Sequence, residues 1–186
     1  MTMAPSLRKF TLTTHVVASV GWLGAVIVFL GLSIAAITSH NPETVRAAYL
    51  AMESIGLFVL VPFSLASLLT GLVQSLGTKW GLVRHYWVLA KLLINVVASL
   101  ILLMYTQTLA SLAAMASADT DLGMLRSPSP VLHAAAGLLL LLTAAALSVY
   151  KPRGMTRYGW RKQQKQRQAL QAVRQDPRQA TLRSDP

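Results

Sequence analysis

Four long apolar blocks constrain this chain more than any other feature of its sequence. They cover about residues 11–37, 46–76, 87–116 and 130–150. A helix needs roughly 20 apolar residues to cross the hydrocarbon core of a bilayer, and each block meets that length. Backbone groups in lipid must be hydrogen-bonded within their own segment or in a closed barrel, so blocks of this length favour helices. The sequence therefore predicts an all-α integral membrane protein whose residues 1–150 form a four-helix bundle.

Composition supports this assignment and narrows the chemistry. Of 186 residues, 54% are hydrophobic and 12% are charged, which is about half the charged fraction of a typical soluble domain. The chain has no cysteine, so disulfides, thiolate metal sites and cysteine nucleophiles are excluded. The net charge is +11, and ten Lys and Arg lie in the tail over residues 151–186. We expect this tail to be a surface helix or disordered, and to contact anionic lipid headgroups rather than nucleic acid.

The distribution of Lys and Arg predicts the orientation of the bundle. Four spans place both termini on one side of the membrane, together with Arg8, Lys9 and the loop cations Lys79 and Arg84. By the positive-inside rule, both termini then lie in the cytoplasm, and we expect a multi-pass protein of a bacterial inner membrane. The first block is longer than the apolar region of a cleaved signal, so we expect it to be retained as a span.

The second block combines a stripe of small and polar residues with a proline. Ser64, Ser67, Gly71 and Gln74 recur at spacings of three and four residues, a pattern that indicates a helix–helix contact. Pro62 lacks a backbone donor and predicts a kink within the span.

Polar residues within the blocks mark a candidate functional layer near the cytoplasmic side, since ionisable groups in a membrane are functional by default. At 1.5 Å per residue, His15 lies about 9 Å below the interface and Lys91 lies about 8 Å below it. The layer contains His15, Trp22, Trp87, Lys91, Asn95 and, at its mouth, His85. The structural alternative is that Lys91 snorkels to the headgroups and that His15 hydrogen-bonds a neighbouring Ser or carbonyl.

A second, thinner polar layer is expected near the opposite side. Glu53 lies about 10 Å and His133 about 5 Å from that interface on the same rise per residue. We expect these two side chains either to partner each other or to meet water.

Imidazole is a common ligand of iron and copper, and helix bundles build cofactor sites from inward-facing side chains. A porphyrin in the first layer would take His15 as axial ligand, with Arg84, Lys79 or Arg8 near its propionates. Lys91 would ligate when neutral and would otherwise pair with a propionate. Copper is less well served, because no His or Met pair lies at i, i+4 on one helix. The sequence supports neither a Ser/His/Asp hydrolase nor a phosphate-binding glycine motif.

Two short motifs make the chain similar to known bacterial membrane proteins. The first block carries H-x6-W-x-G from His15, and the third carries W-x3-K-L-L from Trp87. Together they resemble HemJ-type protoporphyrinogen oxidases and the membrane domain of the copper-resistance protein CopD. The stretch GLVQSLGTKWGLVRHYWVLAKLL looks closer to a family of uncharacterised four-helix bacterial membrane proteins. The similarity covers about residues 10–105.

In HemJ-type oxidases the matching His and Lys are essential, and the His is associated with haem b. The resemblance thus implies His15 as the axial ligand of haem b and Lys91 as a second ligand or charge partner. The chain lacks the Arg- and Tyr-bearing continuation of the oxidases and the Met/His clusters of the copper proteins. We therefore expect a haem-b-binding membrane protein and leave redox activity and the catalytic residues open. The alternatives are a non-enzymatic structural or accessory subunit, as a homo-oligomer or with a membrane partner, and a CopD-like transporter of copper or a small solute.

Overall fold

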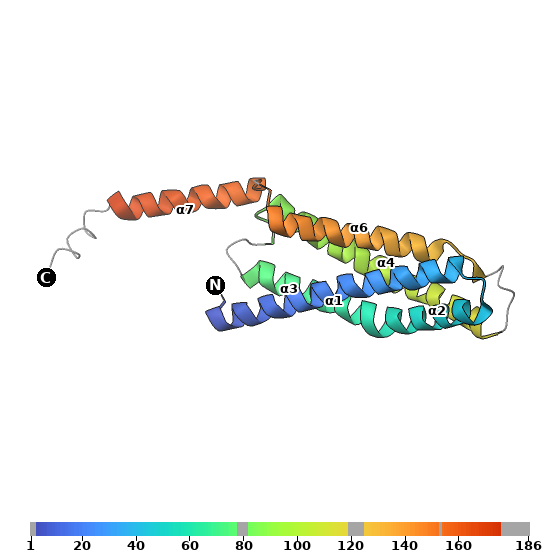
Figure 1. The fold of residues 1–186 in the computed structure, drawn as a ribbon. Helices are drawn as coiled ribbons and strands as arrows, with labels where there is room; N and C mark the ends of the chain where they lie inside the picture. Colours follow the sequence, from blue (N-terminus) through green and yellow to red (C-terminus); the bar gives the residue numbers. More distant parts are fainter. Residues whose placement is uncertain (1–2, 78–81, 119–124, 153, 176–186) are drawn as a thin grey trace.

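The computed structural model describes residues 3–77, 82–118, 125–152 and 154–175. Within these residues the chain is helical and forms no β-strand. Four helical segments are long and apolar enough to cross a membrane, which confirms the predicted all-α bundle and a multi-pass membrane protein (Figure 1). They cover Pro5–Thr38, Pro42–Gly77, Tyr86–Ser117 and Ser129–Tyr150.

The first, third and fourth spans are the single helices α1 (Pro5–Thr38), α4 (Tyr86–Ser117) and α6 (Ser129–Tyr150). A proline lies in the first turn of both α1 and α6, where a backbone N–H would have no partner within the helix. Helix α1 begins about two turns before the apolar block predicted from residue 11. Its first residues, PSLRKF, are exposed, so this end of α1 extends beyond its apolar stretch.

The second span is built from α2 (Pro42–Ile55), the π-helical turn η1 (Gly56–Leu60) and α3 (Val61–Gly77). The π turn ends directly before Pro62, and the N–H of its C-cap residue bonds to the carbonyl of the residue five positions earlier, Gly56. In a regular helix the proline ring would clash with the carbonyl four residues earlier. The irregularity predicted at Pro62 thus takes the form of a local π turn.

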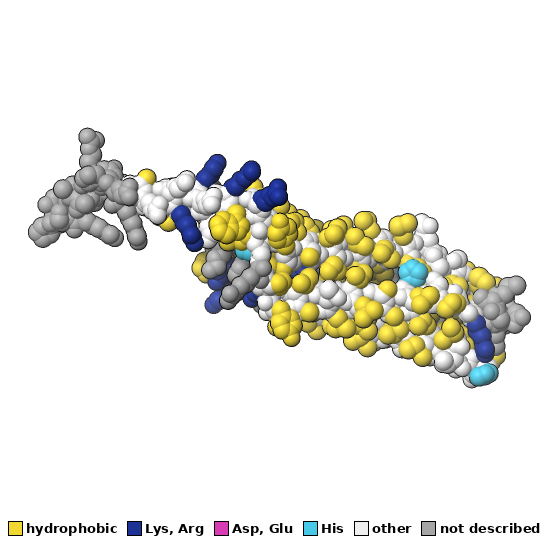
Figure 2. All heavy atoms as spheres, turned by 90° about the horizontal axis from the view of Figure 1, so that it is seen from above, with side chains coloured by type: hydrophobic (Ala, Val, Ile, Leu, Met, Phe, Trp, Pro, Cys, Tyr) yellow, Lys and Arg dark blue, Asp and Glu magenta, His cyan; other side chains and the backbone are white. Residues whose placement is uncertain are grey.

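The four spans surround one apolar core. Helix α1 packs against α2, α3 and α6, and α4 packs against the same three helices from the other side. The core contains Trp22, Phe29, Tyr49, Met52, Leu60 and Tyr105. Large apolar side chains also cover the outside of the bundle, as Figure 2 shows for one face. An apolar exterior of this kind is suited to lipid as the surrounding solvent.

The N-terminus and the tail lie at the same end of the bundle, which we call the basic end because Lys and Arg gather there (Figures 1 and 2). We call the opposite end, where α1 meets α2, the distal end. The tail forms helix α7 (Arg157–Gln175), which continues beyond the bundle (Figure 1). The tail is thus helical over Arg157–Gln175, and residues 176–186 lie outside the described residues.

Thr156 joins α7 to the bundle. Its N–H donates to Arg84 O at 3.0 Å, its hydroxyl donates to Val83 O at 2.5 Å, and the same hydroxyl accepts from Gly159 N at 3.1 Å. A Cβ on Gly159 would lie 2.5 Å from Arg84 O, so this close approach requires glycine. The segment before α4 therefore holds the first turn of α7 in place.

Candidate functional site

His15 is tethered to α3 through one ring nitrogen. Its Nδ1 lies 3.1 Å from Ser67 O and 3.0 Å from Thr70 Oγ1. The Thr70 hydroxyl donates its own hydrogen to Ala66 O at 2.5 Å, so it accepts from the imidazole, as the carbonyl must. Nδ1 therefore carries the proton, and Nε2 is the unprotonated nitrogen of the neutral ring.

A glycine makes room for this imidazole. A Cβ on Gly71 would lie 3.0 Å from His15 Cε1, which is tighter than ordinary van der Waals contact. The side chain of His15 is half-buried against this part of α3. The stripe of small and polar residues on α3, which predicted a helix–helix contact, thus also provides the space that the His15 ring occupies.

Ser67 connects three helices. Its hydroxyl lies 2.8 Å from Ser19 Oγ on α1 and accepts a hydrogen bond from Asn95 Nδ2 on α4 at 3.4 Å. The structure therefore brings His15 and Asn95 together through Ser67, a residue that the sequence indicated only as a packing position. We call His15, Ser19, Ser67, Thr70 and Asn95 the polar layer. The Oδ1 atom of Asn95 is buried and has no hydrogen-bond partner in the described part of the chain.

Lys91 lies one helical turn nearer the basic end than Asn95. Its ammonium is 5.6 Å from the centre of the Trp87 ring, within the range of a cation–π interaction. It is close enough to His15 for its charge to act on the imidazole, and it also interacts electrostatically with Lys151. The structure thus places Lys91 at the edge of the polar layer, where it faces the basic end.

His85, predicted at the mouth of this layer, and the described cations predicted near the propionates lie outside the layer. His85 is the N-cap residue of α4, with its ring 6.2 Å from that of Trp87, and its backbone pairs with Met155. Arg84 donates to Gln166 Oε1 at 3.3 Å and so belongs to the junction with α7. Arg8 is exposed on the first turns of α1, and Lys79 lies outside the described residues.

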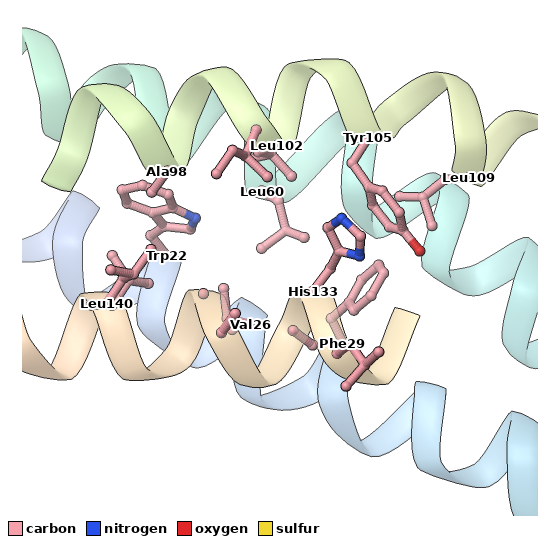
Figure 3. Close-up of a pocket in the computed structure, with 16 residues that line it drawn as sticks. Trp22, Val26, Phe29, Leu60, Ala98, Leu102, Tyr105, Leu109, His133 and Leu140 are labelled. Atoms are coloured by element: carbon pink, nitrogen blue, oxygen red, sulfur yellow. The ribbon is translucent and has the colours of Figure 1, made fainter. Parts of the chain in front are cut away.

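Trp22 lines an apolar cavity instead of the polar layer. The cavity has a volume of about 320 Å³ and lies between α1, α4 and α6, with Leu60 of η1 at its base. Trp22 is 3% exposed and lies with Leu140 at the end of the cavity nearer the basic end (Figure 3). Seven residues of helix rise separate it from His15, about 10 Å, so it is not a wall of the polar layer.

His133 lies at the distal end of the same cavity. Its ring stacks on Tyr105, with the ring centres 4.0 Å apart (Figure 3). Its Nδ1 lies 2.9 Å from Ser129 O, and the Tyr105 hydroxyl lies 3.1 Å from Ser129 Oγ. The imidazole is therefore positioned by its own helix and by α4.

Glu53 does not partner His133. It lines a separate cavity of about 220 Å³, together with Thr106 and Gln107 of α4. Of the residues that line them, Leu109 is common to both cavities. Glu53 and His133 line separate cavities, so the structure does not support a Glu53–His133 pair.

Among the described residues, no group of three or more His, Cys, Asp or Glu side chains is arranged to hold a metal ion. No protein family, curated protein or solved structure matches the chain. The fold defines a multi-pass helical membrane protein, and its function must be inferred from the polar layer and the cavities.

Proposed function

We propose that the protein binds haem b in the membrane, with His15 as an axial ligand. The observation that carries this proposal is the tether of Nδ1 to Ser67 O and Thr70 Oγ1. Metal-binding histidines commonly donate the second ring N–H to a carbonyl, which fixes the tautomer and leaves Nε2 for the metal. His15 has this arrangement inside an apolar helix.

The residues of the layer fit haem as donors. His15 supplies one nitrogen ligand. Lys91, whose side chain lies over Trp87, would pair with a propionate as an ammonium or ligate as a neutral amine. The 320 Å³ cavity begins at Trp22 and does not include His15, so a porphyrin at Nε2 requires the helices at the basic end to move apart. Side chains of α1 and α4 in that region, His15 and Lys91 among them, are only half-buried.

Bound haem would supply one-electron chemistry at its iron. The role of the chain's own groups would be to bind the haem and to orient its ligand. Ser67 and Thr70 fix the imidazole ring, and Gly71 leaves space for it. Lys91 places a positive charge at the edge of the layer.

The test is the absorbance of the full chain purified in detergent after expression with a haem precursor. We expect a Soret band that His15→Ala abolishes and that His40→Ala leaves unchanged, since His40 is exposed in the turn between α1 and α2. His85→Ala is a second control, because His85 belongs to the α7 junction. A wild-type protein that stays colourless under these conditions would refute the proposal.

A structural or accessory subunit is the second candidate. The same hydrogen bonds favour it, because Ser19–Ser67 and Asn95–Ser67 join three helices whether or not a cofactor binds. In that case His15→Ala lowers thermal stability while the wild-type protein shows no absorbance in any preparation. The Soret measurement and a melting curve on the same samples separate the two candidates.

The orientation of the chain is also a proposal. The gathering of Lys and Arg at the basic end supports a cytoplasmic location for both termini in a bacterial inner membrane, with α7 against anionic headgroups. Because the chain has no cysteine, single cysteines at His40 and Gln164, both exposed, can be labelled with a membrane-impermeant maleimide. In intact spheroplasts we expect the reagent to label only the cysteine of His40→Cys. Labelling of Gln164→Cys alone would show the opposite orientation.

A further inference from the structure

The cavity between α1, α4 and α6 opens toward the surrounding lipid. Ile101 of α4 and Leu132 of α6 line it, and both are exposed on the outside of the bundle. Its other walls are buried apolar side chains such as Val26 and Leu60. A ligand entering between α4 and α6 therefore comes from the bilayer, and it must be soluble in lipid.

Aromatic rings are concentrated in this cavity. Trp22, Phe29 and Tyr105 line or adjoin it, and the His133 ring is stacked on Tyr105 (Figure 3). Flat aromatic walls favour a flat ligand, since rings prefer offset-stacked or edge-to-face contacts. A volume of about 320 Å³ lies at the small end of ligand sites and suits one substituted ring better than a porphyrin.

The cavity has a polar group at each end. At one end the indole nitrogen of Trp22, which can only donate, points into the cavity (Figure 3). At the other end His133 uses Nδ1–H toward Ser129 O at 2.9 Å, so Nε2 of the neutral ring is an acceptor. Along α6, Leu140 and His133 mark the two ends and lie about 10 Å apart.

We propose that this cavity binds the ring of a lipid-soluble quinol. One ring hydroxyl donates to His133 Nε2, and the oxygen on the opposite side of the ring accepts from the Trp22 indole. The hydrocarbon tail leaves between α4 and α6 into the bilayer. The oxidised quinone has no hydroxyl to donate to His133, so the reduced form binds more tightly. This site is separate from His15, and it does not depend on haem binding.

The test is native mass spectrometry of the full chain in detergent, titrated anaerobically with decylubiquinol, decylubiquinone or decanoate. We expect one quinol per chain, binding about fivefold more tightly than the quinone, which corresponds to one hydrogen bond. Decanoate has the chain but no ring, and we expect it to bind at least tenfold more weakly. Equal affinity for decanoate would mean that an acyl chain fills the cavity and would overturn the proposal.

A pair of glycine substitutions provides a matched control. A Cβ on Gly137, which lines the cavity, would meet no atom within 4 Å, and the same holds for Gly24, which is exposed on α1. Gly137→Leu therefore starts from a Cβ with free space and places its side chain toward the cavity, and we expect at least a tenfold loss of quinol affinity. Gly24→Leu makes the same chemical change outside the cavity and should leave the affinity within twofold of wild type.

His133→Phe tests the hydrogen bond, since it keeps a ring beside Tyr105 and removes the acceptor. We expect about fivefold weaker quinol binding and little change for the quinone, so that the preference for the reduced form disappears. The Soret spectrum is recorded on every variant. Loss of quinol binding with the Soret band intact assigns the effect to the cavity, and loss of the Soret band with quinol binding intact assigns it to the His15 site. Unchanged quinol affinity in both Gly137→Leu and His133→Phe would refute the cavity as the site.

Discussion

Ser67 allows a sharp test of the polar layer, because its hydroxyl and its carbonyl serve different partners. The hydroxyl lies 2.8 Å from Ser19 Oγ and 3.4 Å from Asn95 Nδ2, whereas the carbonyl lies 3.1 Å from His15 Nδ1. Ser67→Ala removes the hydroxyl and keeps the carbonyl. We therefore expect this variant to weaken the packing of α1, α3 and α4 while leaving His15 tethered.

The expected cost follows from the two distances. The bond to Ser19 has an ordinary length, and the contact with Asn95 is near the upper limit for a hydrogen bond. Interhelical hydrogen bonds in membrane proteins contribute about 0.6 kcal/mol on average and at most about 1.7 kcal/mol. One full and one weak bond give a loss of about 1 kcal/mol in the free energy of unfolding, or about fivefold in the equilibrium constant.

The assay is reversible unfolding in mixed detergent micelles, followed by circular dichroism. Ser64→Ala is the matched control, because Ser64 is as buried as Ser67 but its hydroxyl donates within its own helix, to Val61 O at 2.9 Å. We expect Ser64→Ala to change the free energy of unfolding by less than about 0.5 kcal/mol. The double variant with Ser19→Ala should cost less than the sum of the single changes, because both remove one shared bond.

Two results would refute this reasoning. Equal destabilisation by Ser64→Ala and Ser67→Ala would mean that loss of a buried hydroxyl, rather than a bond between helices, sets the cost. Strict additivity of Ser19→Ala and Ser67→Ala would likewise exclude their hydrogen bond as a source of stability. Ser67→Ala keeps the carbonyl that accepts from His15. If haem binds to the wild type and this single change abolishes the Soret band, the carbonyl is not what holds His15.

Other predictions concern packing. Gly21→Ala places a Cβ 2.8 Å from the Phe63 ring, and we expect it to cost about 1–3 kcal/mol in the same unfolding assay, whereas Gly24→Ala, which meets nothing within 4 Å, should be neutral or stabilising. Equal effects of the two changes would contradict the close packing of α1 on α3. Tyr49→Phe removes the buried hydroxyl that donates to Leu125 O and should cost about 1–3 kcal/mol; a change near zero would show that this carbonyl finds another donor.

Much of the fold could be predicted because membrane helices must satisfy their own backbone groups. Length and hydropathy alone indicated the four spans, and the tail was expected as a helix or as disordered chain. The predicted layer, whose level was set by the depths of His15 and Lys91, also included Asn95, and the structure joins His15 and Asn95 through Ser67. The rise per residue is nearly constant in a helix, so depth can be read from sequence without knowledge of packing.

The direction in which each side chain points could not be read in this way. Glu53 and His133 were placed near one side of the membrane, yet they line separate cavities. Trp22 was predicted in the same layer as His15, but two turns of helix rise put it in the apolar cavity. The cavity itself depends on how the side chains of three separate helices pack against one another, and a local sequence pattern does not predict that packing.

The partner of His15 could be predicted only in kind, as a neighbouring Ser or carbonyl, and not by residue. One of its two acceptors is the backbone carbonyl of Ser67, and every residue has such a carbonyl, so the sequence does not indicate which one is used. A helical carbonyl also accepts from the N–H four residues on, which makes a second bond to a side chain hard to anticipate. Thr70, three residues later, was the available signal, because its hydroxyl lies on the face of α3 that carries the small and polar stripe.

The π turn of η1 makes the second span sensitive to the insertion or deletion of a residue. Each residue turns an α-helix by about 100°, so deleting one residue between Gly56 and Leu60 would rotate α3 by about that angle relative to α2. The span would still be long enough to cross the membrane, and Tyr49 would keep its place. Ser67, however, would turn away from His15. A deletion in this segment thus changes the helix register, which a substitution does not, and descendants of this chain should keep a fixed count of residues between Tyr49 and Ser67.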